Sequence, residues 1–426
     1  MLSQAKPASV AAASPGTCSL QTEPLKLFLI AGEHSGDALG AKLIEALRAL
    51  SPRPLALEGV AGKLMAAQGC PSLFPLAEIA VMGPLDILPR LPAIWHRIQE
   101  TKRAAVAFAP HVVVILDSPE FTHQVAKRIR RLRPVIPIVD YVSPSVWAWR
   151  PGRARSMRRY IDHVLAVLPF EPEALRRLDG PPCSYVGHPL VEKLDWIETL
   201  DAKALRERLR IAKESTIVVV LPGSRLSEVK RLMAPFGETL RRLEEQIGPF
   251  EVILPAVDSV RELIGEGLRL WPLKPHLVSG ETDKFAAFKL ARAALAASGT
   301  VTLELALSGT PMVVGYRGDW LASRLKFLVV AHSVVLPNLV LGENVFPELL
   351  LDDCTSEKLA HAMLPLCRGG PERERQLDSV KRVRRLVREE GESPSLRAAQ
   401  IVLAYAERAG AKVGERILGQ RASIGM

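Results

Sequence analysis

The sequence has no run of about 20 consecutive apolar residues, the length that a membrane-spanning helix requires, so we expect a soluble or peripheral protein. Residues 1–24 are rich in Ala, Ser, Pro and Gln and have no basic start followed by a long apolar run. This composition favours a disordered extension over a signal peptide. The five cysteines lie far apart and in no metal-ligand spacing, which favours reduced thiols over disulfides or a zinc site.

Several nucleotide-binding motifs are missing too. The sequence contains neither G-x-G-x-x-G nor a P-loop, so it gives little support for a dinucleotide or triphosphate site. It also contains no D-x-D, the motif whose carboxylates hold Mg²⁺ or Mn²⁺ under a diphosphate. What is present is a basic excess: 56 Lys and Arg against 46 Asp and Glu give a formal charge of +10. That charge suits nucleic acid, an anionic membrane surface or a phosphorylated small substrate without choosing among them.

Alternating apolar runs, glycine turns and amphipathic stretches predict an α/β protein, and 426 residues suffice for two cores. We predict two Rossmann-like domains that face each other across a cleft holding a phosphorylated ligand. The predicted parts are a disordered extension at 1–24, an N-terminal domain at 25–200, a C-terminal domain at 201–385 and C-terminal helices at 386–426. Strands are expected at 25–31, 111–117, 137–142, 163–167, 216–221, 250–255, 276–278, 294–297 and 311–316, with a polar loop at 337–339 and a helix start at 344–350.

The C-terminal half carries the stronger ligand signal, a strand, turn and short helix within 294–317. Unpaired backbone N–H groups at the start of that helix, beside the hydroxyls of Ser298 and Thr300, form a cradle for phosphate. Glu304 lies four residues after Thr300 on the same helix face, where its carboxylate can accept hydrogen bonds from two ribose hydroxyls. The alternative is an ordinary turn with a solvated Glu304. A second glycine turn at 222–225 places Arg225 for phosphate.

In the N-terminal half, small residues in the turn at 32–37 let a substrate approach the backbone; the alternative is that Ser35 or Asp37 only caps the helix that follows. Asp117 ends a buried strand, the place where parallel α/β sheets carry catalytic groups. It can act as general base toward a hydroxyl, and helix capping is the competing role. Further along, Trp147 and Arg150 belong to an aromatic and guanidinium cluster that can stack on a sugar and hold phosphate; a solvated basic helix is the alternative.

The stretch 81–102 mixes apolar residues and a tryptophan with cations. Such a segment can lie in a membrane interface, with its apolar side in the acyl boundary and its cations on lipid phosphate. Packing of the same side chains in the protein core is the alternative. Two prolines, Pro89 and Pro92, argue against one regular helix across the whole stretch.

Short blocks that occur in order from about Leu25 to Leu366 carry a resemblance to a known family. They are AGEHSGD at 31–37, VMG at 81–83, ILDSPEF at 115–121, YVSPSVWAWR at 141–150, LPFE at 168–171, VGHPL at 186–190, LPGSR at 221–225, ASGTVTLE at 297–304, PMVVGYR at 311–317 and LPNL at 336–339. Together they resemble lipid-A-disaccharide synthases, and YVSPSVWAWR is the most specific of them. The chain departs from the family's usual pattern at Glu120 and Thr122 and in the loop at 344–346.

The resemblance implies a GT-B fold and an inverting transfer of diacylated glucosamine from UDP to lipid X, the monosaccharide 1-phosphate. The absence of D-x-D favours a metal-independent enzyme. It implies UDP-2,3-diacylglucosamine, lipid X and the anionic surface of the inner membrane, met from the cytoplasmic side, as partners. No cofactor and no nucleic acid is implied, and a homodimer is left open. Two other functions stay open: another GT-B UDP-sugar enzyme, such as a peptidoglycan glycosyltransferase or a UDP-sugar epimerase, and a basic nucleic-acid-binding protein, for which the sequence has no recognised module.

The resemblance also assigns roles to residues, except in the membrane contact, which rests on the composition of 81–102. Asp117 matches the family's catalytic base. The expected UDP and donor site comprises Ser224, Arg225, Ser298, Gly299, Thr300, Glu304 and Asn338. The expected glycine-loop and acceptor side comprises Glu33, Ser35, Gly36, Asp37, Trp147 and Arg150. The expected membrane contact comprises Leu85, Leu88, Leu91 and Trp95.

Overall fold

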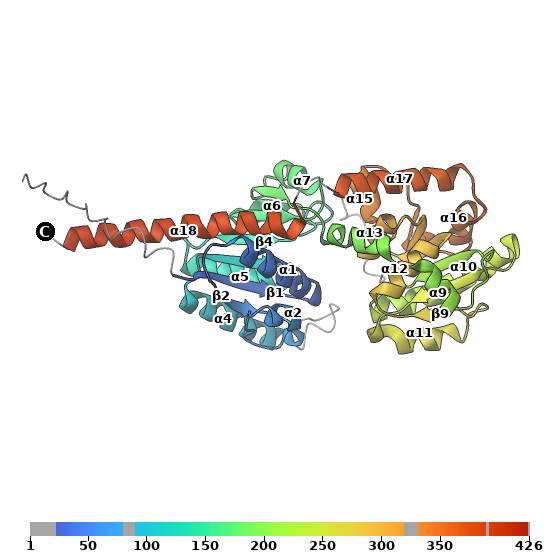
Figure 1. The fold of residues 1–426 in the computed structure, drawn as a ribbon, viewed down its shortest axis with the longest axis horizontal. Coiled ribbons are helices and arrows are strands. Elements are labelled where there is room, and N and C mark those ends of the chain that lie inside the picture. Colours follow the sequence, from blue (N-terminus) through green and yellow to red (C-terminus); the bar gives the residue numbers. More distant parts are fainter. Residues whose placement is uncertain (1–22, 80–89, 319–330, 389–391, 425–426) are drawn as a thin grey trace, which may run out of the picture. The chain divides into compact units, whose positions relative to one another are not determined.

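A computed structural model describes residues 23–79, 90–318, 331–388 and 392–424, with side chains as far as residue 409. It contains two six-stranded sheets, in the orders β2-β1-β3-β4-β5-β6 and β12-β11-β10-β7-β8-β9 (Figure 1). The chain divides into two compact units. The first takes in the chain up to Tyr141, Tyr160–Asp162 and the chain from Ser395, and the second takes in Val142–Arg159 and His163–Pro394. The domain boundaries expected near residues 200 and 385 stay predictions.

The first sheet is built around β1 and β3, whose residues are almost all buried. β1 pairs in parallel with both β2 and β3, which is why these strands read as continuous apolar runs rather than as alternating patterns. The strands are β1 (Leu25–Ala31), β2 (Leu55–Val60), β3 (Val112–Leu116), β4 (Ile138–Tyr141), β5 (His163–Ala166) and β6 (Cys183–Tyr185). The helices that accompany them are α1 (His34–Leu50), α2 (Lys63–Ala67), α4 (Leu91–Phe108), α5 (Pro119–Leu132), α6 (Gly152–Met157), α7 (Glu171–Arg177) and the terminal α18 (Pro394–Ile424), with the 3-10 helix η1 at Leu76–Glu78.

The second sheet is likewise parallel, and β10 pairs with β7 on one side and β11 on the other. Its core joins Val218 and Val220 of β7 to Phe236 of α10 and Leu295 of β10. The strands are β7 (Ile217–Leu221), β8 (Glu251–Pro255), β9 (His276–Val278), β10 (Ala293–Ala297), β11 (Met312–Tyr316) and β12 (Glu348–Leu350). The helices are α8 (Leu194–Thr199), α9 (Ala202–Arg208), α10 (Leu226–Ile247), α11 (Arg261–Leu268), α12 (Glu281–Leu290), α13 (Thr300–Ser308), α15 (Leu336–Leu341), α16 (Ser356–Arg368) and α17 (Pro371–Val387), with the 3-10 helices η3 (Pro189–Lys193), η4 (Asp258–Val260) and η6 (Leu351–Asp353).

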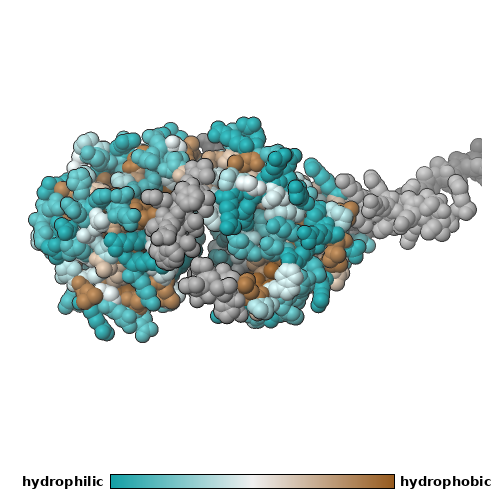
Figure 2. All heavy atoms as spheres, turned by 180° about the vertical axis from the view of Figure 1, so that it is seen from behind, coloured by the Kyte–Doolittle hydropathy of each residue, from teal (hydrophilic) through white to brown (hydrophobic). Residues whose placement is uncertain are grey.

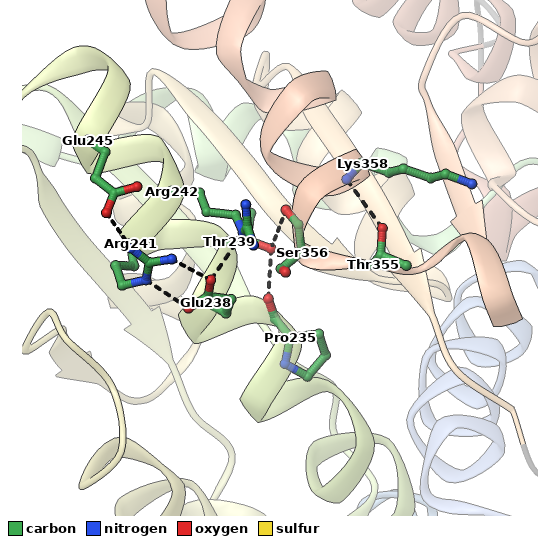
Figure 3. Close-up of polar contacts among 9 residues, drawn as sticks. All are labelled: Pro235, Glu238, Thr239, Arg241, Arg242, Glu245, Thr355, Ser356 and Lys358. Atoms are coloured by element: carbon green, nitrogen blue, oxygen red, sulfur yellow. Dashed lines mark hydrogen bonds and ion pairs between the residues drawn. The ribbon is translucent and has the colours of Figure 1, made fainter.

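Polar contacts lie within α10 and at the start of α16, and one of them, between Thr239 and Ser356, connects the two helices (Figure 3). Thr239 is fully buried, and its hydroxyl donates to the Pro235 carbonyl at 2.7 Å while lying 3.5 Å from the Ser356 carbonyl of α16. The hydroxyl of Thr355 caps α16 by accepting the Lys358 N–H at 3.3 Å. The buried Thr239 hydroxyl thus has partners, and one of the N–H groups at the start of α16 is capped.

The expected α/β class is confirmed, and each predicted strand is found within about two residues of its expected bounds. The expectation for 337–350 is wrong. Residues 337–339 lie in α15, which Pro337 can open because its missing N–H is not needed in a first turn. Glu348–Leu350 forms β12 instead of a helix start because it pairs with β11 at the edge of the sheet.

Candidate active site

A pocket of about 540 Å³ opens at the carboxyl edge of the second sheet. It lies beyond the ends of β7, β8, β9 and β10, and the strand order reverses between β7 and β10. This is the place where open parallel sheets bind ligands. Its lining is Leu221, Gly223, Ser224, Arg225, Glu228, Pro255, Ala256, Val257, Asp258, Ser279, Gly280, Glu281, Lys284, Ala297, Ser298, Gly299, Thr300, Val301 and Glu304.

Three helices, α10, α12 and α13, begin at this pocket. Gly280 and Gly299 precede two of them, with φ values of 82° and 142° that glycine adopts readily. The positive ends of three helix dipoles therefore face one space. The pocket is suited to an anionic ligand, such as a diphosphate.

Four of the charged side chains that line the pocket form two pairs. Nζ of Lys284 lies 2.9 Å from Oε1 of Glu304, and both side chains are mostly buried. An Nη atom of Arg225 lies 3.3 Å from Glu228, whose other carboxylate oxygen accepts the Ser224 N–H at 3.2 Å. The Arg225 side chain is 59% exposed, so it can turn to a ligand without a large desolvation cost.

Six of the seven residues expected at the donor site line this pocket, and Asn338 does not. Asn338 is fully buried; its Oδ1 accepts the N–H groups of Val345 and Phe346 at 3.0 and 2.9 Å, and its Nδ2 donates to the Phe346 carbonyl at 2.9 Å. In this arrangement its amide holds the loop at 344–346 and is not presented to a ligand. A polar residue inside an apolar helix gives the same sequence pattern whether it contacts a ligand or fastens a neighbouring loop.

Four charged lining residues are not among those expected from the sequence: Glu228, Asp258, Glu281 and Lys284. The signal that points to them is the start of a helix after a strand. Glu281 and Lys284 open α12 just beyond β9, as Thr300 opens α13 just beyond β10. Applying the strand-end rule to every strand, rather than to those followed by a glycine and a hydroxyl, would have found them.

In the first unit, Asp117 follows β3 and has a left-handed backbone, with φ at 57°. Each of its carboxylate oxygens has a donor: Ser35 Oγ lies 2.7 Å from Oδ2, and the Ser118 N–H lies 2.7 Å from Oδ1. Asp117 is half-buried and Ser35 is exposed. The side chain is therefore oriented by its neighbours while part of it can still meet a substrate. Asp117 and Ser35 lie beyond β3 and β1, between which the strand order of the first sheet reverses.

The glycines before Asp37 allow close packing around Asp117. A Cβ on Gly32 would lie 2.2 Å from Ser118 Cβ, and one on Gly36 would lie 2.9 Å from the Leu116 carbonyl oxygen. Both distances are shorter than a van der Waals contact, so the turn needs glycine for its own packing. This reason for the glycines differs from the substrate approach expected from the sequence.

Asp37 caps a helix, although not the helix in which it lies. Its side chain is buried and accepts the N–H groups of Gly62, Leu64 and Met65 at 2.9, 3.0 and 2.9 Å, at the start of α2. Asp37 therefore has a capping role, but at α2 and not at the helix that follows the 32–37 turn. Glu33 is exposed at the start of α1, where its side chain makes no capping hydrogen bond.

Trp147 and Arg150 are placed differently from each other. Trp147 Nε1 donates to Glu171 at 3.2 Å, and its ring packs edge-on against Phe170 with centroids 5.0 Å apart. Arg150 is exposed, and its guanidinium stacks over the Trp149 ring at 4.2 Å. The Trp147 ring is thus held in place by Glu171 and Phe170, whereas the exposed Arg150 guanidinium can contact a ligand at the surface.

Of the expected membrane contact, Leu85 and Leu88 lie outside the described residues. Leu91 and Trp95 lie in the first turns of α4 and are 49% and 54% exposed. The Arg128 guanidinium stacks over the Trp95 ring at 4.4 Å. The alternative that these two side chains pack in the core is wrong.

Within the described ranges, no group of three or more His, Cys, Asp or Glu is placed to hold a metal ion, and no disulfide forms. Burial raises the pKa of the Cys70 thiol to about 12 and that of Cys367 to about 11, so both stay protonated at neutral pH. No helix in the same ranges is both long and apolar enough to span a bilayer.

Comparison with known proteins agrees with this geometry. Residues 27–402 match the profile of a family described as "Lipid-A-disaccharide synthetase". Lipid-A-disaccharide synthases of Nitrobacter hamburgensis and Rhodospirillum centenum are 50% and 43% identical, each over 89% of this chain, with 95% and 94% of those proteins covered.

Solved structures resemble this one in fold, at low sequence identity. A UDP-GlcNAc 2-epimerase from Neisseria meningitidis bound to UDP-GlcNAc has a TM-score of 0.60 at 12% identity, covering 90% of this chain and all of that one. MurG from Acinetobacter baumannii has a TM-score of 0.54 at 12% identity, covering 89% of this chain and all of that one. The expected GT-B fold is thereby confirmed.

Proposed function

The chain belongs to the lipid-A-disaccharide synthase family, and on that premise we propose that it transfers 2,3-diacylglucosamine from UDP to the 6-hydroxyl of lipid X, with inversion. The products are the β-linked disaccharide 1-phosphate and UDP. The observation that carries the proposal is the match to the family over 27–402, which includes the residues around both Asp117 and the pocket of the second unit.

UDP is the ligand that we propose for the pocket. Its diphosphate would lie at the starts of α10 and α13, near Arg225, where helix dipoles and a guanidinium neutralise charge. Its ribose would lie at Glu304, whose orientation is fixed by Lys284. The same groups would stabilise UDP as it leaves, because the negative charge on the diphosphate grows as the bond to the sugar breaks. We therefore propose that departure of UDP needs no metal ion.

Asp117 is the proposed general base. It would take the proton of the acceptor hydroxyl as that oxygen forms a bond to C1 of the donor sugar, and the electrons of the C1–O bond would leave with UDP. Attack from the face opposite UDP inverts the configuration at C1. The support for this role is a half-buried carboxylate at a strand end with two fixed hydrogen-bond donors.

A peripheral position on the cytoplasmic face of the inner membrane is the further part of the proposal. Acylated substrates reside in a bilayer, so the enzyme must reach its surface. Figure 2 shows that, on the face drawn, apolar residues are scattered among hydrophilic ones. The exposed pair Leu91 and Trp95, with Arg128 beside it, has the apolar, aromatic and cationic character of an interfacial contact.

The direct test is a mass-spectrometric assay of the purified full-length chain with UDP-2,3-diacylglucosamine and lipid X. We expect a tetraacylated disaccharide phosphate and UDP, formed equally with and without EDTA. Lack of this product together with conversion of UDP-GlcNAc to an epimer would overturn the proposed function. Product that disappears with EDTA would contradict the metal-independent part alone.

A further inference from the structure

The backbone at Asp117 is held in an unusual conformation. Asp117 and the next residue, Ser118, have φ values of 57° and 45°. Of the non-glycine residues that the structure describes with positive φ, these are the only two in succession. Such a backbone is strained for residues that carry a Cβ, and it persists only where neighbouring groups hold it.

Thr122 is the side chain that holds this turn from below. It lies in the first turns of α5 and is fully buried. Its Oγ1 lies 2.8 Å from the Asp117 carbonyl oxygen and 3.0 Å from that of Ser118. The Ser118 carbonyl also accepts the Thr122 backbone N–H at 3.1 Å, as expected at a helix start. The hydroxyl of Thr122 is thus the donor that reaches back beyond the helix to the Asp117 carbonyl.

Two other elements complete the arrangement. The Asp117 N–H donates to the carbonyl of Tyr141 in β4 at 3.2 Å. Gly32 leaves room for Ser118, since a Cβ there would lie 2.2 Å from Ser118 Cβ. The N–H and C=O of Asp117 are therefore tied to different elements, and the direction of its Cα–Cβ bond is set by both.

We propose that Thr122 is a positioning residue for the transfer reaction, which keeps Asp117 left-handed so that its carboxylate meets Ser35 Oγ and the acceptor hydroxyl. This inference rests on the proposed function, in which Asp117 is the base. If the Asp117 carbonyl loses its donor, the turn can relax toward negative φ, and this rotation moves the carboxylate away from Ser35. Misplacement of a base by about 1 Å is enough to slow a reaction by up to about 100-fold.

The test uses Thr122→Val, which keeps the shape and removes the hydroxyl, and Thr122→Ser, which keeps the hydroxyl. Thr101→Val is the matched control, because Thr101 is also fully buried in a helix of the same unit and its hydroxyl donates to the carbonyl four residues earlier, that of Arg97, at 2.7 Å. The full-length variants are compared in kcat, KM for lipid X, affinity for UDP and midpoint of thermal unfolding. Crystal structures of the wild type and of Thr122→Val give the φ of Asp117.

We expect Thr122→Val to lower kcat by about 10- to 100-fold with an unchanged affinity for UDP. Thr122→Ser should retain most of the wild-type kcat. Thr101→Val should keep kcat near the wild type despite a loss of stability similar to that of Thr122→Val. Equal kcat in the two valine variants, or a serine variant as slow as Thr122→Val, would overturn the proposal. If the wild type forms no disaccharide, the proposed function fails instead. The φ of Asp117 in Thr122→Val then still decides whether Thr122 holds the turn.

Discussion

At the scale of single residues, Asp117 joins the properties that a general base needs. Its carboxylate is half-buried, both oxygens have a donor, and its backbone is fixed from two sides. A base in such a site is held in one orientation before the substrate binds, so little conformational freedom has to be lost in the reaction. The pocket for the proposed donor is organised similarly, with Glu228 holding the 223–225 turn and Lys284 holding Glu304.

Asp117→Asn should abolish turnover, with kcat lowered by at least about 100-fold, and leave the affinity for UDP near the wild type. The amide oxygen can still accept from Ser35, but the amide nitrogen cannot take a proton. Steady-state kinetics and calorimetric titration with UDP measure the two effects. Asp378→Asn, an exposed carboxylate on α17, is the control. Loss of UDP binding in Asp117→Asn would show a structural role instead.

Arg225→Ala should weaken UDP binding because the diphosphate loses a charge-assisted partner, worth about 1.5–3 kcal/mol or roughly 10- to 150-fold in affinity. Isothermal titration at low and high salt measures the change. Arg269→Ala removes an exposed guanidinium outside the pocket and should leave the affinity unaltered. The same affinity in both variants would remove Arg225 from the nucleotide site.

At the scale of elements, residues of the sequence motifs also fasten helices and loops. Asp37 ties α1 to the start of α2, and a Cβ on Gly62 would lie 2.3 Å from its Oδ2. Glu171 is buried at the start of α7 and accepts the N–H groups of Val167 and Leu168 as well as Trp147 Nε1. Residues within a motif can therefore serve the shape of the site without touching a ligand.

Asp37→Ala should lower the free energy of unfolding by about 1–3 kcal/mol, because three N–H groups of α2 lose their acceptor. Asp37→Asn should be milder, since Oδ1 can still accept from Gly62 and Met65. Urea unfolding measures both variants. A normal unfolding midpoint combined with a raised KM for lipid X in both would instead make Asp37 a substrate contact.

His188 opens η3, where its Nδ1 accepts the Leu190 N–H at 3.2 Å. Burial lowers its pKa from 6.5 to about 4. Between about pH 4 and about pH 6.5, His188 is protonated in the unfolded chain and neutral in the native state. Its contribution to the free energy of unfolding is therefore fully present above about pH 6.5 and is lost as the pH falls toward about 4. When the pH is lowered from about 7.5 to about 5, we expect this histidine to lower the free energy of unfolding by about 2 kcal/mol.

His188→Asn keeps an acceptor for the Leu190 N–H but does not titrate, so it serves as the reference. Urea unfolding of both proteins at the two pH values gives the difference. If the free energy of unfolding of the variant falls with pH as steeply as that of the wild type, the pH dependence comes from other groups.

At the scale of the whole molecule, many of the basic side chains form local ion pairs, and the basic excess is what remains beside them. Arg382 binds Glu343 at 2.6 Å, and Arg388 lies 3.6 Å from Asp195. Exposed pairs of this kind contribute little to stability, and the surplus cations around them still attract anionic surfaces. In the proposed membrane contact, long-range attraction to a bilayer and local insertion of Leu91 and Trp95 would be separable contributions.

Leu91→Ser combined with Trp95→Ser should lower the affinity for anionic vesicles about tenfold, because an interfacial contact buries the apolar area of both side chains. Co-sedimentation with the vesicles measures this affinity. Both side chains are about half exposed, so the midpoint of thermal unfolding should change little. Leu270→Ser is the control, as Leu270 is 87% exposed in the second unit. Vesicle binding that falls equally in the control, or not at all, would contradict a membrane contact at the start of α4.

The sequence by itself determined the α/β class, nine of the twelve strands that the structure describes, and the strand ends at which candidate site residues lie. These features depend on local periodicity and on glycine turns, so they can be read from neighbouring positions. The strand-end rule found Asp117, Arg225 and Glu304 for the same reason. The expected role of Asn338 at the donor site did not come from that rule and stays a prediction; the burial of Asn338 depends on how α15 packs.

Only the tertiary structure decided which residues meet. Ser35 and Asp117 are 82 positions apart, and Lys284 and Glu304 are 20 apart on different helices. Asp37 turned out to cap α2, whose start is 25 residues further on, rather than its own helix. No periodicity encodes such pairs, because they arise when separate strands come to lie side by side and bring their end loops to one edge of a sheet. The strained turn at Asp117 and Thr122 beneath it belong to the same class of feature.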